Sequence, residues 1–104
     1  MEPHRVLREA LRNYLTFEEF CGQHGQYTIE HRGLTLSFLD LQNAFESLSP
    51  RKKEAILYNV ILDWKQKDVA AHMGIRTVTV GQYVDSGCAQ IAAQYFGLED
   101  QSSL

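Results

Sequence analysis

Four residues between positions 77 and 82 are of types suited to contact with the edges of base pairs. Gln82 can donate and accept hydrogen bonds at an adenine edge, and Val78 or Thr79 can contact a thymine methyl group. A glycine at position 81 would let a helix backbone approach a ligand closely. The predicted base-contacting residues are Thr77, Val78, Gly81 and Gln82. The alternative is an ordinary solvent-exposed helix face.

Basic residues in the same half of the chain could bind phosphate groups. They are Arg51, Lys52, Lys53, Lys65, Lys67 and Arg76. The predicted phosphate-contacting residues among them are Lys52, Lys53, Lys65 and Arg76, beside helix N-termini whose backbone N–H groups would add donors. Three consecutive cations at residues 51–53 oppose the dipole of a helix that begins there, which favours a functional reason over plain solvation.

Other groupings of reactive side chains are weak. Cys21, His24 and His31 have a loosely metal-like spacing, but no fourth ligand is obvious, although His4 is present. We therefore expect no metal and no cofactor. No nucleophile–base set, paired carboxylates or glycine-rich phosphate loop stands out, so we expect a binding protein rather than an enzyme.

The residues at 65–83 must be positioned by two helices. Val69, Ala70 and Met73 repeat at the spacing of one helix face, and Gly74 follows where a helix can end in the left-handed conformation. Ile75 is the predicted buried turn residue. A second stripe follows at intervals of three and four residues, formed by Val80, Val84, Cys88 and Ile91. Two helices joined by a glycine turn form the unit that places a helix in a DNA groove.

Earlier segments read as further helices and one hairpin. Apolar residues from Val6 to Leu15 predict a helix beginning near Pro3; either it runs on to Cys21, or Thr16 and Glu19 cap a new one. Gly22 and Gly25 would end it. Alternation over residues 27–36 predicts a β-hairpin that packs on a helix.

Two capping signals predict the remaining helices. Ser37 with Asp40 starts one that ends near Leu48, and Ser49-Pro50 starts one that ends near Asp63. The last helix would run to Phe96 and close at Gly97. The predicted core residues are Phe45, Ile56, Val60, Trp64, Val69, Met73, Val80 and Val84. We expect a mostly α domain in one compact unit: residues 1–40 as a partner or dimer surface, residues 41–96 with the helix-turn-helix, and a polar tail at 97–104.

Composition narrows the class of protein. With 104 residues, 44% of them hydrophobic, the chain is long enough for one modest core, and its net charge of −3 argues mildly against a strong nucleic-acid binder. Cys21 and Cys88 are far apart, as is typical of reduced thiols in the cytosol. The N-terminal segment MEPHRVLREAL lacks the apolar core of a signal peptide, and no apolar run reaches membrane-spanning length. We therefore expect a cytoplasmic protein that does not bind membranes.

From Leu41 onward the chain resembles region four of bacterial sigma factors, the promoter-reading helix-turn-helix of RNA polymerase. The resemblance is carried by LSPRKKEAILYNVI, KQKDVAAHMGI and RTVTVGQYV, in which Thr79-Val80 match the Thr-Val of the family. The first is similar to the family's leucine-proline-arginine entry and apolar helix, and the second to its turn. Response-regulator effector domains share much of this pattern.

The chain departs from that family in three ways. No segment resembles the preceding region that engages the polymerase clamp or melts promoter DNA, so we do not expect a complete sigma factor. The predicted second motif helix, TVTVGQYVDSGCAQIAAQYF, has no Lys or Arg, where the family carries several. Gly81 and Gly87 lie inside that helix, and each costs about 0.8–1 kcal/mol relative to Ala.

The resemblance implies two functions. The first is a small transcription regulator that binds double-stranded DNA; because one motif buries little DNA surface, useful affinity would need a homodimer or a tether to polymerase. The second is an adaptor or inhibitor directed at RNA polymerase or sigma that has lost DNA binding, because region-four domains also grip the flap of the polymerase β subunit. The lack of Lys and Arg after Arg76 and the acidic total favour the second function.

Overall fold

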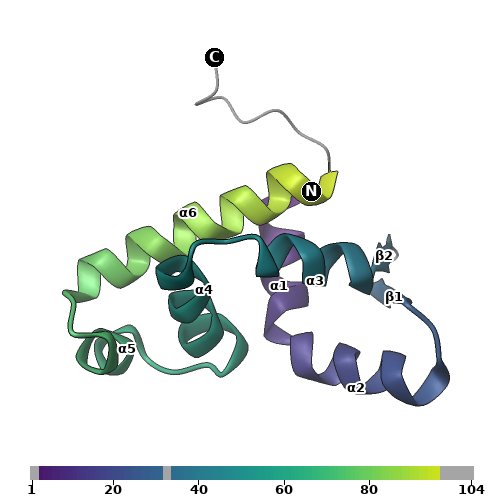
Figure 1. The fold of residues 1–104 in the computed structure, drawn as a ribbon, viewed down its shortest axis with the longest axis horizontal. Helices are drawn as coiled ribbons and strands as arrows, with labels where there is room; N and C mark the ends of the chain where they lie inside the picture. Colours follow the sequence, from purple (N-terminus) through teal and green to yellow (C-terminus); the bar gives the residue numbers. More distant parts are fainter. Residues whose placement is uncertain (1–2, 32–33, 97–104) are drawn as a thin grey trace.

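A computed structural model of the chain describes residues 3–31 and 34–96 (Figure 1). Its helices are α1 (Pro3–Arg12), α2 (Tyr14–His24), α3 (Phe38–Glu46), α4 (Pro50–Ile56), α5 (Gln66–Met73) and α6 (Thr77–Phe96), with a π-helical turn at Leu57–Ile61. The strands β1 (Thr28–His31) and β2 (Leu34–Ser37) form an antiparallel hairpin. The predicted class, a mostly helical domain with one short hairpin, is confirmed. The predicted helix end at Gly97 and the predicted tail lie outside the described residues.

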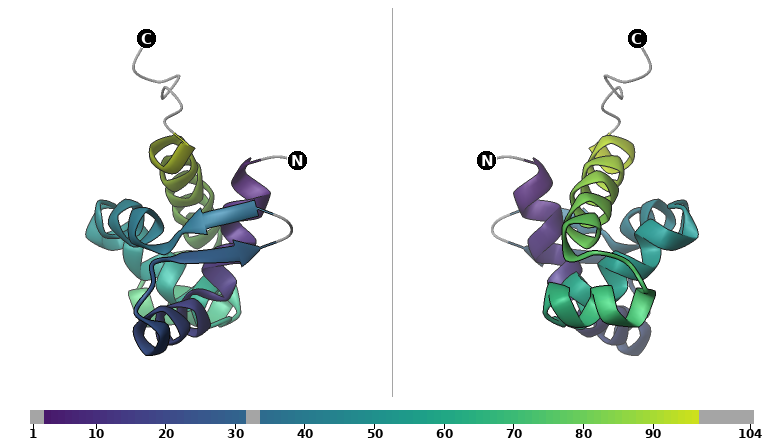
Figure 2. Two further views of the ribbon diagram at one scale, coloured as in Figure 1. Left: turned by 90° about the vertical axis from the view of Figure 1, so that its right-hand side faces the viewer. Right: turned by 90° about the vertical axis from the view of Figure 1, so that its left-hand side faces the viewer.

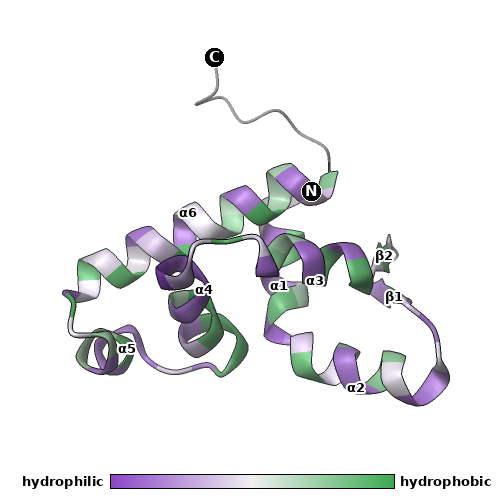
Figure 3. Cartoon of the chain, in the orientation of Figure 1, coloured by the Kyte–Doolittle hydropathy of each residue, from purple (hydrophilic) through white to green (hydrophobic). Residues whose placement is uncertain are grey.

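The long helix α6 organises the core. It contacts α1, α3, α4 and α5, and Figure 2 shows it between α1 on one side and α3 on the other. Along its ribbon, hydrophobic and hydrophilic segments alternate (Figure 3), as expected for a helix that buries one face. The predicted stripe is confirmed, because its four residues are all buried: Val80, Val84, Cys88 and Ile91.

The N-terminal helical segment breaks at Asn13. The backbone there (φ −104°, ψ 15°) leaves the helical region, and the Asn13 amide donates a 3.0 Å hydrogen bond back to the carbonyl of Glu9. Both predicted alternatives are therefore wrong: the first helix ends at Arg12 and does not run on to Cys21, and the next helix begins at Tyr14 and is not capped at Thr16. The break also leaves Leu15 outside the core. Of the two predicted terminators, only Gly25 ends α2, in the left-handed conformation, whereas Gly22 lies inside the helix.

The hairpin contacts the helices through its buried side chains and through hydrogen bonds at Ser37. Ile29 pairs with Leu36 in register, and both side chains are buried in the common core. Ser37 ends β2 and caps α3, because its hydroxyl accepts a hydrogen bond from the Asp40 backbone N–H, as predicted. The Ser37 N–H donates to the Tyr95 hydroxyl at 2.7 Å, which links the hairpin to the end of α6. The prediction that the hairpin packs on a helix is confirmed.

One predicted core residue is wrong. Trp64 is 39% exposed, whereas the other seven predicted core residues are buried. The helix that begins at Pro50 ends in a π-helical turn at Ile61, before the predicted end, and Asp63 then adopts a positive φ of 59°. This reversal directs the Trp64 ring outward, where it packs on Tyr58 (ring centroids 4.6 Å apart) and His72 (5.7 Å).

Candidate nucleic-acid interface

A glycine turn joins α5 to α6 as the sequence predicts. Gly74 has φ 69° and ψ 36°, and its N–H donates to the Ala70 carbonyl, so it is a left-handed C-cap. The Ile75 N–H donates to the same carbonyl at 3.0 Å, and the Ile75 side chain is half-buried against the core rather than fully buried. The buried residues of α5 and of the first turns of α6 belong to one core, which holds the two helices as a helix-turn-helix.

The first turns of α6 expose the face opposite the buried stripe. Thr77 and Gln82 are exposed, and Val78 is 57% exposed, although an apolar side chain gains by burial. Val78 and Gln82 are four residues apart and therefore neighbours on the helix surface. Three of the four predicted base-contacting residues thus have side chains open to the outside of the molecule.

Gly81, the fourth, lies at the edge of that face. A Cβ atom built on it would be 3.7 Å from Nε2 of Gln66, the first residue of α5, which is ordinary van der Waals contact. Gly81 therefore lies in the crease between the start of α5 and the start of α6. The fold has room for a methyl group at this position.

Exposed cations surround the same two helix starts. Lys65 is the N-cap residue of α5, Lys67 lies in its first turn, and Arg76 immediately precedes α6. All three side chains are exposed, and no described residue forms an ion pair with them. Backbone N–H groups at a helix start favour anions as well, so both the cationic side chains and the backbone N–H groups at these positions can bind phosphate.

The structure does not bring Lys52 and Lys53 to this place. Lys52 Nζ donates a 2.6 Å hydrogen bond to Gln90, which lies 13 residues beyond Thr77 and hence about 20 Å along α6. Lys53 Nζ forms a 3.0 Å ion pair with Glu46 of α3. Both lysines link α4 to neighbouring helices instead of flanking the exposed face of α6.

Comparison with known protein families supplies a match. The family model described as Sigma-70, region 4 matches residues 38–91, which include α3, α4, α5 and most of α6. The chain belongs to this family. Comparison with curated proteins and with solved structures gave no match. The expected resemblance of the C-terminal half is thereby confirmed, and α1 and α2 lie outside the matched segment.

The residues considered as metal ligands lie before the matched segment and are not gathered. Cys21 is buried with a free thiol, the His24 ring packs on Phe20, and His31 faces Glu9 at 3.6 Å. Among the described residues, no three metal-binding side chains come together. None of the described helices is both long and apolar enough to span a membrane.

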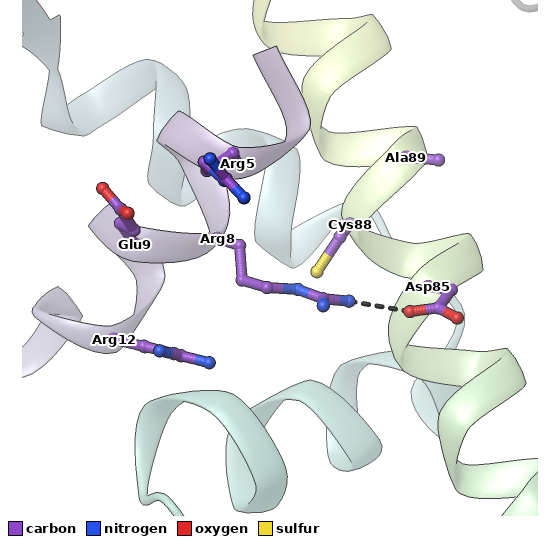
Figure 4. A pocket seen from close by; sticks show the side chains of 7 residues that line it. All are labelled: Arg5, Arg8, Glu9, Arg12, Asp85, Cys88 and Ala89. Atoms are coloured by element: carbon purple, nitrogen blue, oxygen red, sulfur yellow. Dashed lines mark hydrogen bonds and ion pairs between the residues drawn. The ribbon is translucent and has the colours of Figure 1, made fainter. Parts of the chain in front are cut away.

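A basic surface that was not predicted from the sequence lies beside α6 of the sigma region 4 domain. Arg5, Arg8 and Arg12 of α1 line a pocket of about 470 Å³ against Asp85 and Cys88 of α6 (Figure 4). The spacing of three and four residues was a readable signal, because it puts all three arginines on one helix face. The partner of that face could not be read from the sequence, because 77 residues separate Arg8 from Asp85.

Proposed function

We propose that this sigma region 4 domain binds double-stranded DNA through α5 and α6 and regulates transcription without catalysing a reaction. The observation that carries the proposal is the exposed face of α6 at Thr77, Val78 and Gln82, with exposed cations at the starts of α5 and α6. Polar and methyl-bearing side chains on an exposed helix start are the groups that read base edges in a major groove.

The base contacts would be divided by side-chain chemistry. The Gln82 amide would form the bidentate contact with adenine, and the methyl groups of Val78 and Thr77 would contact thymine. Gly81 would let the α6 backbone come close to the duplex, which gives a use to its low helix propensity.

The phosphate contacts would come from the cations at the two helix starts. We assign Lys65 and Arg76 from the predicted set to this task and add Lys67, because their side chains are exposed and not engaged by described residues. We leave Lys52 and Lys53 out, because each already bonds a neighbouring helix. One such motif buries little DNA, so a homodimer or a tether to polymerase would raise affinity.

A second candidate function is an adaptor that binds RNA polymerase, in particular the β-subunit flap. It is favoured by the absence of Lys and Arg along all 20 residues of α6. A groove of about 460 Å³ lies between α3 and the segment that runs from α4 into the π-helical turn. Its apolar side chains, Phe45, Pro50, Leu57 and Tyr58, would contact such a partner, and its charged side chains are Glu46, Lys53 and Glu54.

A salt titration of binding to random-sequence duplex DNA separates the two functions. Neutralising both helix-start cations (K65Q/R76Q) should weaken binding and reduce the slope of log K against log salt by about two units. The double variant K52Q/K53Q removes the same charge elsewhere and should keep the slope of the unaltered chain. Salt-independent or undetectable DNA binding, together with capture of purified polymerase, would support the adaptor instead.

A further inference from the structure

The basic face of α1 is packed beside α6 rather than left free in solvent. Arg8 Nη2 donates a 2.8 Å hydrogen bond to Oδ1 of Asp85, and Figure 4 shows Arg8 reaching across the pocket to this carboxylate. Arg5 and Arg12 lie three residues before and four residues after Arg8, so they share its helix face. All three line the same pocket.

Some of the charged side chains around this pocket are paired with one another or with the hairpin. The hydrogen bond to Asp85 raises the pKa of the Arg8 guanidinium, so Arg8 and Asp85 offset each other. Glu9, the other carboxylate of the pocket, points away from this pair in Figure 4 and lies 3.6 Å from His31 of the hairpin. Burial raises the pKa of the Cys88 thiol, so the floor of the pocket is uncharged at neutral pH.

Arg5 and Arg12 are the cations that this arrangement leaves for an external ligand. Both side chains are exposed, and neither is hydrogen-bonded or ion-paired to a described residue. Their separation of seven residues corresponds to about 10 Å along α1. They therefore offer two separate points of positive charge rather than one cage for a small anion.

The pocket continues the exposed face of α6. Asp85 lies three residues beyond Gln82 and seven beyond Val78, so all three share one face of the helix. Asp85 is thus about 10 Å along α6 from Val78. The major groove of B-DNA is about 12 Å wide and is bordered by the phosphates of both strands. If the first turns of α6 occupy a major groove, one of the two DNA strands that border this groove would lie beside α1.

We propose that Arg5 and Arg12 bind phosphates of the DNA strand that borders the groove occupied by α6. Arg8 bonds Asp85 and so neutralises this carboxylate, which would otherwise repel the duplex. This inference rests on the proposed function. In this arrangement α1 supplies the cations that α6 lacks, and the segment before residue 38 takes part in DNA binding.

The test measures the salt dependence of binding to a random-sequence duplex for R5Q/R12Q beside K52Q/K53Q. Both variants lose two positive charges, but the second loses them beside Gln90 and Glu46, away from α1. R5Q/R12Q should reduce the slope by about two units. If the affinities of the two proteins converge near 1 M salt, this corresponds to a loss of roughly sixtyfold in affinity at 0.1 M salt. K52Q/K53Q should keep the original slope. Circular dichroism melts should show both variants folded, because Arg5 and Arg12 are exposed and the contacts of Lys52 and Lys53 lie at the surface.

A second pair of variants tests the role of Asp85. D85N releases Arg8 and should raise affinity by roughly eightfold at 0.1 M salt, with a slope steeper by about one unit. E46Q releases Lys53 from a similar ion pair on the other side of α6 and should leave affinity unchanged.

Three outcomes would overturn the inference. An unchanged slope in R5Q/R12Q, while K65Q/R76Q loses slope, removes α1 from the DNA surface and leaves the proposed function standing. Equal losses in R5Q/R12Q and K52Q/K53Q would show a general charge effect. If the unaltered chain binds no duplex, the proposed function and this inference fail together. In that case, loss of polymerase capture in R5Q/R12Q would assign Arg5 and Arg12 to the binding of a protein partner.

Discussion

Gly81 and Gly87 lie six residues apart in α6, and a methyl group added at each would meet different surroundings. At Gly87, the added Cβ would lie 2.5 Å from Cδ1 of the fully buried Ile56 and 3.6 Å from Cδ1 of Leu48. At Gly81, the nearest atoms belong to the Gln66 amide, at 3.7 and 3.8 Å. The core therefore accounts for one glycine and leaves the other unexplained.

The difference shows that α6 has two parts: one packs on the other helices, and the first turns present an exposed face. From Val84 onward its packing is set by α1, α3 and α4, and a glycine is needed where α4 comes close. In its first turns the fold would accept Ala, which forms helices more readily by about 0.8–1 kcal/mol. A residue that the fold does not require, at the edge of a face that the fold leaves exposed, is the expected sign of a contact with a partner outside the chain.

The largest expected effect is on stability, and it comes from comparing the buried and exposed faces of the first turns of α6. Val80 is fully buried, so V80D would bury an unpaired charge and should remove about 4 kcal/mol or more from the free energy of unfolding. V78D introduces the same group two residues earlier on the exposed face and should change the free energy of unfolding by less than about 0.5 kcal/mol. Urea titrations followed by circular dichroism measure both values. Equal losses would show that Val78 is not on an outer face.

The next effect concerns sequence preference. Q82A should lower affinity for the preferred duplex, selected from a random library, by about 1–3 kcal/mol while leaving affinity for random DNA unchanged. Gln94 lies on the same helix, where it accepts a hydrogen bond from the Ser47 hydroxyl at the end of α3, so Q94A is the matched control and should keep the preference. Loss of random-DNA affinity in Q82A would mean that Gln82 contacts the backbone and does not read bases.

Gly87 gives the third prediction. G87A should lower the free energy of unfolding by about 1–2 kcal/mol, because overpacking outweighs the gain in helix propensity. The replacement I56V removes the methyl group that the new Cβ would meet, at a loss of its own of about 0.5–1.5 kcal/mol. In the I56V background, G87A should therefore cease to destabilise the domain. Additive losses would refute the close contact with α4.

The features that could be predicted from the sequence are those set within a few residues of the chain. The caps at Ser37 and Ser49, the left-handed turn at Gly74 and the buried stripe of α6 follow from local hydrogen bonds and helical period. The exposed positions Thr77, Val78 and Gln82 followed from that stripe by elimination.

The features that could not be predicted depend on contacts between distant segments. Trp64 is outside the core because a π-helical turn and the positive φ of Asp63 redirect the chain, and an aromatic residue after a helix does not reveal this. Lys52 and Lys53 bond Gln90 and Glu46, which a run of cations does not disclose. For the same reason, the approach of α1 to Asp85 had no sequence signal.

The smallest expected effect decides whether Gly81 has a purpose outside the fold. G81A should raise the free energy of unfolding by about 0.8–1 kcal/mol, since Ala favours helix and the added methyl fits beside Gln66. At the same time, affinity for duplex DNA should fall by roughly fivefold, about 1 kcal/mol, because the methyl keeps the α6 backbone from the groove. G22A makes the same change inside α2, where nothing lies within 4 Å of the new Cβ, and should stabilise the domain with no loss of DNA binding. A gain in stability together with lower affinity, seen in G81A and not in G22A, separates the partner surface of α6 from its core. If G81A binds DNA as tightly as the unaltered chain, the duplex does not approach this crease, and the groove-facing set contracts to Thr77, Val78 and Gln82.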